Sequence, residues 1–125
     1  MAIRRFVVSV TTASDGSATY YTPYLSGFIH SIEYLKTNFT DGVDFTITAE
    51  ATGETIWTEA NVNAAKVCLP RAATHSTAGV ASLYASAGTA VNDRIALGRD
   101  RVKIVIASGG NATTGAFHVI VEDPA

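Results

Sequence analysis

The segment from 100 to 122 constrains the fold more than any other part of the sequence. Aliphatic residues recur at every second position over 102–106, and apolar residues do so again over 117–121. The run between them is rich in glycine and other turn formers, and alternation on both sides of such a run is typical of an antiparallel hairpin. Val105 and Ile120 make the opposite face partly apolar as well. We therefore expect the pair to lie centrally in a sheet or to be covered by another chain.

Similar alternation predicts most of the other strands, at residues 3–11, 18–24, 28–36, 44–50, 54–59, 66–69 and 91–97. Pro23 cannot donate a ladder hydrogen bond, so its strand ends there or lies at a sheet edge. Over 28–36 we expect Phe28, Ile32 and Tyr34 on one face and Ile29 and Leu35 on the other. Strands at this spacing predict an all-β fold for residues 1–125. We expect one domain, an antiparallel β-sandwich or jelly-roll-like barrel of about 7–9 strands.

One long segment, residues 71–90, does not alternate. It is rich in Ala, Ser, Thr and Gly, and its largest apolar side chains are Leu83 and Tyr84. Segments of this length without periodicity are uncommon inside compact domains and are usually functional or mobile. We expect an extended loop or arm here, with a short helical turn around 79–85.

The surface is expected to be poor in charge. Charged residues make up 16% of the chain and hydrophobic residues 47%, against a usual charged share of about 25%. This suits a protein that neighbouring subunits partly cover, and a monomer with a coat of Ser and Thr is the alternative. The net charge is −2 and the largest basic cluster is the pair Arg4 and Arg5. Nucleic-acid binding is not expected, because it needs several positive charges on one face.

Cys68 is the single cysteine of the sequence, so no disulfide can form within the chain. No signal-peptide pattern opens the sequence, and no apolar run approaches about 18 residues. We therefore expect a protein that is made in a reducing cytosol and does not cross a membrane by itself.

The ionisable residues form no pattern that is typical of catalysis or metal binding. His30, His75 and His118 are far apart, and none has a second ligand at metal-binding spacing. Phosphate-binding loops and nucleophile elbows are not found. The carboxylates that come closest to a pattern are interpreted as turn or surface residues, namely Asp41, Asp44, Glu50, Glu54 and Glu59. The sequence predicts no catalytic, metal-binding or cofactor-binding residue and no enzyme.

Contacts with partner proteins are the remaining candidates for function. Trp57 lies on a predicted hairpin whose outer face is polar, so it is either a core residue or an exposed anchor for a partner. The predicted strand around Tyr20 is rich in aromatic residues, and the 71–90 segment is uncharged over most of its length. The candidate partner contacts are Arg71, His75, Leu83, Tyr84, Trp57, Tyr20 and Tyr21.

Five stretches carry a resemblance to known proteins, namely Ser26–Tyr34, Phe39–Thr48, Thr52–Trp57, Pro70–Ala72 and Asp100–Gly110. Together they resemble a family of small virion proteins of tailed bacteriophages, over most of the chain beyond the first strand. The resemblance implies a small β-rich virion component and carries over no catalytic residue. Cys68 and Leu69 depart from the family pattern, which has aromatic residues before the Pro-Arg pair.

The resemblance implies a non-enzymatic structural protein, a capsid decoration or cement protein that binds and stabilises the shell of major capsid protein. We expect a homo-oligomer, with a trimer favoured, on the capsid surface of a virion made in the host bacterial cytoplasm. Low charge, spare apolar faces and a pliable arm suit this role, and repeated copies supply avidity. Two alternatives stay open. One is a head–tail connector or tail-completion component. The other is a receptor- or carbohydrate-binding module of a tail fibre. Such a site needs an aromatic platform, which Tyr20, Tyr21, Tyr24 and Trp57 could supply.

Overall fold

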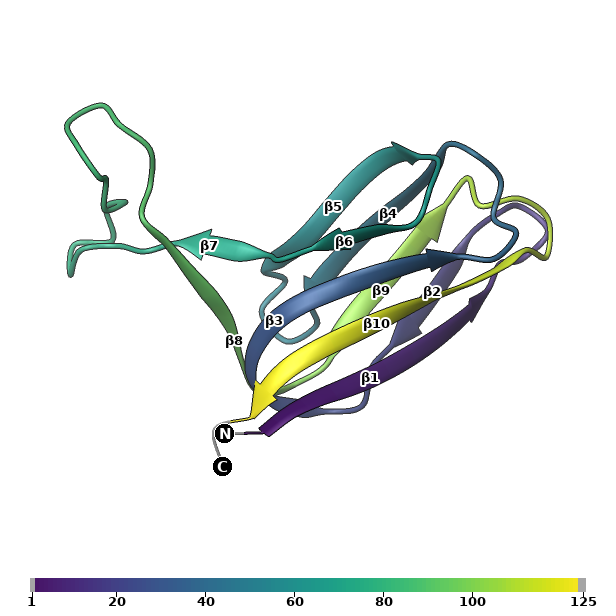
Figure 1. Cartoon of the computed structure of the whole chain (residues 1–125), viewed down its shortest axis with the longest axis horizontal. Coiled ribbons are helices and arrows are strands. Elements are labelled where there is room, and N and C mark those ends of the chain that lie inside the picture. The colour runs from purple at the N-terminus through teal and green to yellow at the C-terminus, as the bar shows by residue number, and fades with distance from the viewer. Residues whose placement is uncertain (1, 124–125) are drawn as a thin grey trace.

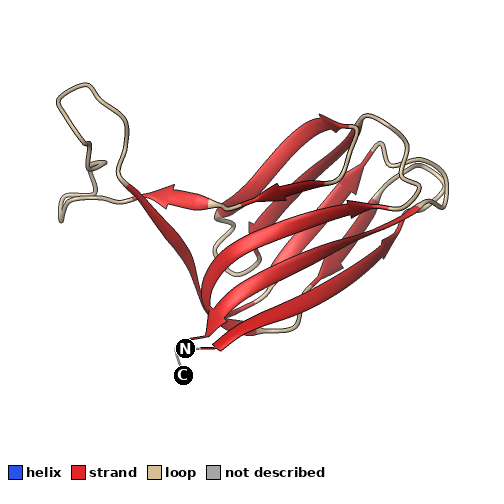
Figure 2. Ribbon diagram, viewed as in Figure 1, coloured by secondary structure: helices blue, strands red, loops and turns tan. Residues whose placement is uncertain are grey.

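The computed structural model describes residues 2–123, which form two antiparallel sheets stacked face to face (Figure 1). The strands are β1 (Ala2–Thr11), β2 (Ala18–Tyr21), β3 (Leu25–Lys36), β4 (Val43–Ala49), β5 (Thr55–Val62), β6 (Lys66–Cys68), β7 (Arg71–Ala73), β8 (Asn92–Asp100), β9 (Val102–Ala107) and β10 (Thr114–Asp123). None of residues 2–123 is helical (Figure 2). The predicted all-β sandwich is confirmed. The strand that was not expected is β7, at the start of the predicted loop.

The larger sheet has six strands, in the order β1-β10-β3-β8-β7, with β6 paired to β3. β3 is long enough to serve two neighbours along one side. Its residues Leu25–Ile29 pair with β8, and Ile32–Tyr34 pair with β6. The smaller sheet has the order β2-β9-β4-β5. β2 ends before Pro23 and lies at an edge, as predicted.

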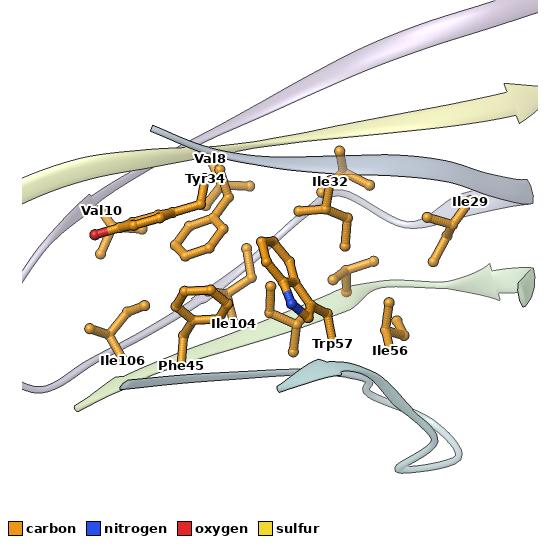
Figure 3. Packing of buried hydrophobic residues seen from close by; sticks show 14 of the residues in the cluster. Val8, Val10, Ile29, Ile32, Tyr34, Phe45, Ile56, Trp57, Ile104 and Ile106 are labelled. Carbon is orange, nitrogen blue, oxygen red and sulfur yellow. The ribbon is translucent and has the colours of Figure 1, made fainter. Parts of the chain in front are cut away.

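The core lies between the two sheets and is built from the inward-facing residues of both (Figure 3). Four aromatic side chains pack at its centre: Tyr34, Phe45, Trp57 and Phe117, with neighbouring ring centroids 4.7–5.3 Å apart. Their planes are tilted or edge-on to one another, which is the favourable arrangement for aromatic pairs. Trp57, which the sequence left open between core and anchor, is 6% exposed and belongs to this core.

β9 and β10 do not pair with each other, so the hairpin predicted over 100–122 is wrong. β9 lies between β2 and β4 in the smaller sheet, whereas β10 lies between β1 and β3 in the larger one. Residues 108–113 therefore carry the chain from one sheet to the other. Alternation is the same in both arrangements, because each strand buries one face either way. The expected central position is confirmed for both strands.

The turn at residues 12–17 holds this crossing in place. Thr12 Oγ1 donates to Gly110 O at 2.7 Å and accepts the Thr113 N–H at 2.9 Å. Gly110 has a φ of +94°, and a Cβ there would lie 2.6 Å from Thr40 Cγ2. The position requires glycine for both its backbone conformation and its close packing.

A bulge in β3 changes the predicted faces of this strand. The register between β3 and β10 skips one residue, His30. The bulge turns Ile29 and Ile32 to the same side, where both are fully buried. The prediction that Ile29 faces away from Ile32 is wrong for this reason, whereas Leu35 lies opposite Tyr34 as predicted.

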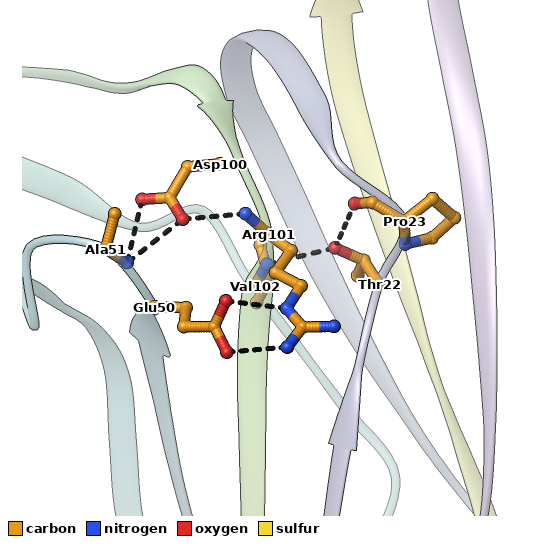
Figure 4. A network of polar contacts seen from close by, with 7 residues as sticks. All are labelled: Thr22, Pro23, Glu50, Ala51, Asp100, Arg101 and Val102. Carbon is orange, nitrogen blue, oxygen red and sulfur yellow. Dashed lines mark hydrogen bonds and ion pairs between the residues drawn. The ribbon is translucent and has the colours of Figure 1, made fainter.

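Polar contacts fix the corner where the chain crosses from β8 to β9 (Figure 4). The buried carboxylate of Asp100 accepts the backbone N–H of Ala51 at 3.0 Å and that of Arg101 at 2.8 Å. Thr22 Oγ1 accepts the Val102 N–H at 2.9 Å. These bonds satisfy backbone donors that no strand partner reaches at the corner, and they join the ends of both sheets.

Candidate interaction surfaces

Residues 74–91, called the arm from here on, project beyond β7 and β8 at one end of the molecule (Figure 1). A closed ring of three backbone hydrogen bonds holds the arm together. Thr74 N–H donates to Val91 O at 2.8 Å, Val91 N–H to Ser82 O at 2.8 Å, and Ser82 N–H to Thr74 O at 2.9 Å. Three parts of the arm therefore lie side by side without forming a regular sheet.

The tip of the arm contains two tight turns. Ser76 N–H donates to Val80 O at 2.8 Å, and Tyr84 N–H donates to Thr89 O at 3.0 Å. The predicted extended arm is confirmed, but the helical turn expected around 79–85 is wrong. None of residues 79–85 is helical, and Ala81 and Leu83 make isolated bridges to His75 and Ala90.

No side chain of the arm is buried. Val80, Leu83 and Tyr84 are 64%, 45% and 74% exposed, and His75 is exposed as well. The arm also falls within the longest uncharged stretch of the sequence, from 72 to 92. Three of the predicted partner contacts, His75, Leu83 and Tyr84, thus lie together on one exposed segment, and sequence analysis missed Val80.

Arg71, another predicted partner contact, lies at the base of the arm. Its Nη1 donates to His30 O at 3.1 Å and to Pro70 O at 2.8 Å. The side chain occupies the fork where β6 leaves β3 and β7 joins β8. Arg71 therefore orients the arm relative to the sandwich.

The predicted aromatic residues do not form one platform. Trp57 packs edge-on against Phe45 inside the core, and its Nε1 donates to Glu59 at 3.0 Å. Tyr20 packs against the core, and its hydroxyl bonds both the N–H and the C=O of Thr11 at 3.3 Å. Both rings thus serve the sandwich itself.

The rings of Tyr21 and Tyr24 both lie close to Arg101 at the corner between β8 and β9. The Arg101 Cζ is 3.9 Å from the Tyr21 centroid and 5.4 Å from that of Tyr24, which is cation–π geometry. Arg101 also forms a bidentate pair with Glu50, at 2.6 and 2.8 Å (Figure 4). Its hydrogen bonds hold the pKa of the Glu50 carboxyl below the usual value. The cluster is an ion pair flanked by aromatic rings.

A hollow of about 400 Å³ lies beside Tyr24. Its lining includes Arg4, Phe6, Tyr24, Leu25, Val121 and Asp123. Arg4 and Asp123 form an ion pair at 3.2 Å. The described lining contains no histidine, cysteine or second carboxylate, so the hollow offers an aromatic edge and a polar rim but no acid–base pair.

The outer face of the larger sheet carries apolar side chains that sequence analysis did not single out. Its exposed apolar residues include Ile3, Val7, Leu35 and Val67, which are 68%, 54%, 41% and 58% exposed. One row of register neighbours crosses four strands of this face, in the order Val7, His118, Glu33 and Val67. Apolar residues at outward positions of alternating strands were the signal that could have found this face.

Phe28 lies on the outer face too. It was expected on the same face as Ile32, but the bulge at His30 reverses its direction. The Arg94 guanidinium covers its ring, with Cζ 4.3 Å from the centroid.

The charged side chains of the outer face are paired with one another. Arg5 Nη1 donates to Glu33 at 2.8 Å and to His118 Nδ1 at 2.7 Å. Arg94 Nη1 donates to Glu122 at 2.8 Å, and this bond raises the pKa of the guanidinium. The face therefore combines exposed apolar groups with charges that are already neutralised.

The other candidate ionisable residues have structural partners. Asp41 is ion-paired with Lys36, and Asp44 accepts the Asn61 N–H at 2.9 Å. Burial raises the pKa of the Cys68 thiol, which makes it a poor nucleophile at neutral pH. Within the described residues, no three His, Cys, Asp or Glu side chains are grouped so that they could hold a metal ion.

Across residues 2–123, no helix has the length and apolarity that a membrane crossing requires. The sequence matches no protein-family model, and no curated protein is significantly similar to it. The function of the chain has therefore to be inferred from its surfaces and its charge distribution.

Proposed function

We propose that the chain is a non-enzymatic structural protein of a tailed-phage virion, a capsid decoration protein that binds and stabilises the shell of major capsid protein. The arm carries this proposal. It is an uncharged segment that projects from the sandwich and exposes Val80, Leu83 and Tyr84. Clustered exposed apolar side chains mark binding surfaces. The resemblance of five sequence stretches to small virion proteins supports another virion protein as the partner.

The charge distribution supports binding by contact area. Arg101 is held by Glu50, and Arg5 is held by Glu33 and His118. Charges that are already paired within the chain are not free to form new ion pairs with a partner, so contact area is left as the source of binding. A decoration protein needs only modest contacts, because many copies on one shell add avidity.

Binding to empty shells tests the proposal. Purified protein is mixed with shells of its own phage that lack it, and the bound copies are located by electron microscopy. Wild type is expected at regular positions over the whole shell. A variant with an Asn-Gly turn in place of residues 75–90 is expected to fold and to leave the shells bare, since it keeps the β7–β8 base but lacks the arm.

The matched control is Thr46→Glu, an exposed position on the outer face of the smaller sheet. This variant is expected to bind like wild type. Folded wild-type protein that leaves the shells bare contradicts the proposal. Binding confined to a single vertex favours the head–tail connector instead.

A carbohydrate-binding module of a tail fibre is the second candidate, because Tyr24 is 58% exposed and borders the hollow. Aromatic rings beside a polar rim are a common way to hold a sugar. If this candidate is correct, a glycan array gives a signal that Tyr24→Ala abolishes and that the arm-shortened variant retains.

A further inference from the structure

We infer that the arm of one copy binds the outer face of the larger sheet of a second copy, head to tail. The inference deepens the proposed function by naming the contact through which copies would join one another. It needs no shell for its test, so it can fail while shell binding holds.

The arm has apolar side chains but nothing of its own to bury them against. Val80, Leu83 and Tyr84 are all exposed, and the arm is held by backbone hydrogen bonds and tight turns alone. Contact with another apolar surface removes such exposed side chains from water, which is favourable in free energy. An aromatic residue such as Tyr84, the most exposed of the three, is favoured at the centre of such contacts.

The outer face of the larger sheet offers a surface of suitable width with apolar side chains on both sides of a paired polar centre. Val7 and Val67 stand at the two ends of the row that crosses β1, β10, β3 and β6. Their strands, β1 and β6, are three strand spacings apart, so the two residues are about 14 Å from each other across the sheet. A segment of the arm can cross the row between these two side chains, and Leu35 extends the same face along β3.

Charge favours the arm as the occupant of this face. The arm has no charged residue, whereas in the middle of the face Arg5 is already hydrogen-bonded to both Glu33 and His118. An uncharged segment can cover these groups without leaving a charge unpaired, whereas a charged partner would have to compete with the Arg5–Glu33 pair. The arm lies in the longest uncharged stretch of the chain, so it matches this requirement better than any other segment.

The arm cannot reach its own outer face in this structure. β7 and β8 carry it away from the sandwich (Figure 1), and Arg71 fixes its base to His30 O. Folding back would break the pairing of Arg71–Ala73 with β8. The contact therefore has to form between copies. Because arm and face are different surfaces, the interface is heterologous and closes into a ring or continues as a chain of copies.

A mixing experiment separates this interface from a symmetric one. The arm variant carries Leu83→Asp and Tyr84→Ser, and the face variant carries Val7→Glu and Val67→Glu. All four positions are exposed, and circular dichroism checks that both variants fold. Each variant alone is expected to lose self-association by at least roughly a hundredfold, as measured by analytical ultracentrifugation.

The two variants mixed in equal amounts are expected to restore one interface. The arm variant still offers an intact face and the face variant an intact arm, so native mass spectrometry should detect a dimer with one copy of each and nothing larger. Thr46→Glu, on the outer face of the smaller sheet, is the matched control and should assemble like wild type. Monomeric wild type, variants that still assemble, a mixture that stays monomeric, or a control that fails to assemble would each overturn the inference.

Shell binding by the face variant distinguishes this inference from the proposed function. Its arm is intact, so it should bind shells at least as single copies if the arm also contacts the capsid. Binding of the face variant to shells together with unchanged self-association would refute the arm–face contact and leave the decoration role intact.

Discussion

The sandwich and the arm are ordered by different interactions. In the sandwich, Tyr34, Phe45 and Phe117 are 2% exposed or less and pack against one another. In the arm no side chain is buried, and a ring of backbone hydrogen bonds joins Thr74, Ser82 and Val91. Burial of a large apolar side chain stabilises by about 1.5–3 kcal/mol, whereas an average hydrogen bond contributes about 0.5–1.5 kcal/mol net.

This difference separates the region that supplies stability from the region that we propose to bind. The sandwich can fold without the arm, because none of its core residues comes from residues 74–91. The arm can change conformation on binding without loosening the core, because its tip shares no buried contact with it. Sequence changes in the two regions should therefore have different readouts, and four of them test this separation.

The largest effect is expected for Phe45→Ala in the core. Phe45 touches the rings of Tyr34, Trp57 and Phe117, so its loss should lower the free energy of unfolding by about 3–5 kcal/mol. Leu83→Ala in the arm should change it by less than about 0.5 kcal/mol. Urea unfolding, followed by Trp57 fluorescence at low protein concentration, measures both. Similar losses for the two variants would contradict the separation.

The next effect is expected for Gly115→Ala, near the start of β10 in the larger sheet. A Cβ there would lie 2.8 Å from Phe39 Cδ2 and closer still to Cε2. Such overpacking should cost about 1–3 kcal/mol of stability. Gly98→Ala is the matched control, because nothing lies within 4 Å of its Cβ position. Equal thermal midpoints for the two variants would show that the Phe39 ring moves aside for the added methyl group at little cost.

Tyr34→Phe is expected to stabilise the sandwich by about 1 kcal/mol. The Tyr34 hydroxyl is buried without a hydrogen-bond partner among the described residues, so its removal relieves a desolvated polar group. Burial raises the pKa of Tyr34 to about 12 from an ordinary value of 10.0. Above pH 10.0 the unfolded chain releases this proton and the folded chain keeps it, so stability falls as the pH rises toward 12.

Denaturant unfolding between neutral and alkaline pH checks this sign. Wild type should lose up to about 1.4 kcal/mol per pH unit over that alkaline range, and Tyr34→Phe should lose less. Parallel curves for the two proteins would mean that another group causes the alkaline loss.

The smallest effect is expected when the arm is shortened. An Asn-Gly turn in place of residues 75–90 should leave the free energy of unfolding within about 0.5 kcal/mol of wild type, since no core contact is lost and loop closure changes little. The same variant should lose binding to shells and to other copies. A large drop in stability for this variant would place the arm within the cooperative fold.

Local patterns in the sequence were sufficient for nine of the ten strands and for the presence of the arm, but not for β7 or for the turns within the arm. Alternation identifies which side chains of a strand are buried, and its absence over 71–90 identifies the arm. Alternation does not identify the partner of a strand, which is why β9 and β10 were expected to pair although they lie in different sheets. The bulge at His30 could not be predicted from the sequence either, because it is defined by the register between β3 and β10.

The candidate surfaces were predicted less completely than the fold. Leu83 and Tyr84 were found because they are large and apolar in an otherwise small and polar segment. Val7 and Val67 were not singled out as a surface, because only the strand order brings them into one row. Arg71 was expected to contact a partner, yet its guanidinium bonds a carbonyl of β3 that the sequence does not place nearby.

The position of β10 between β1 and β3 also bears on protein synthesis. β10 follows every other strand in the chain, so the ribosome delivers it after all of its neighbours. Until then β1 has no strand to pair with, and the larger sheet lacks the strand that joins β1 to β3. A nascent chain therefore cannot display the completed outer face until β10 has been made.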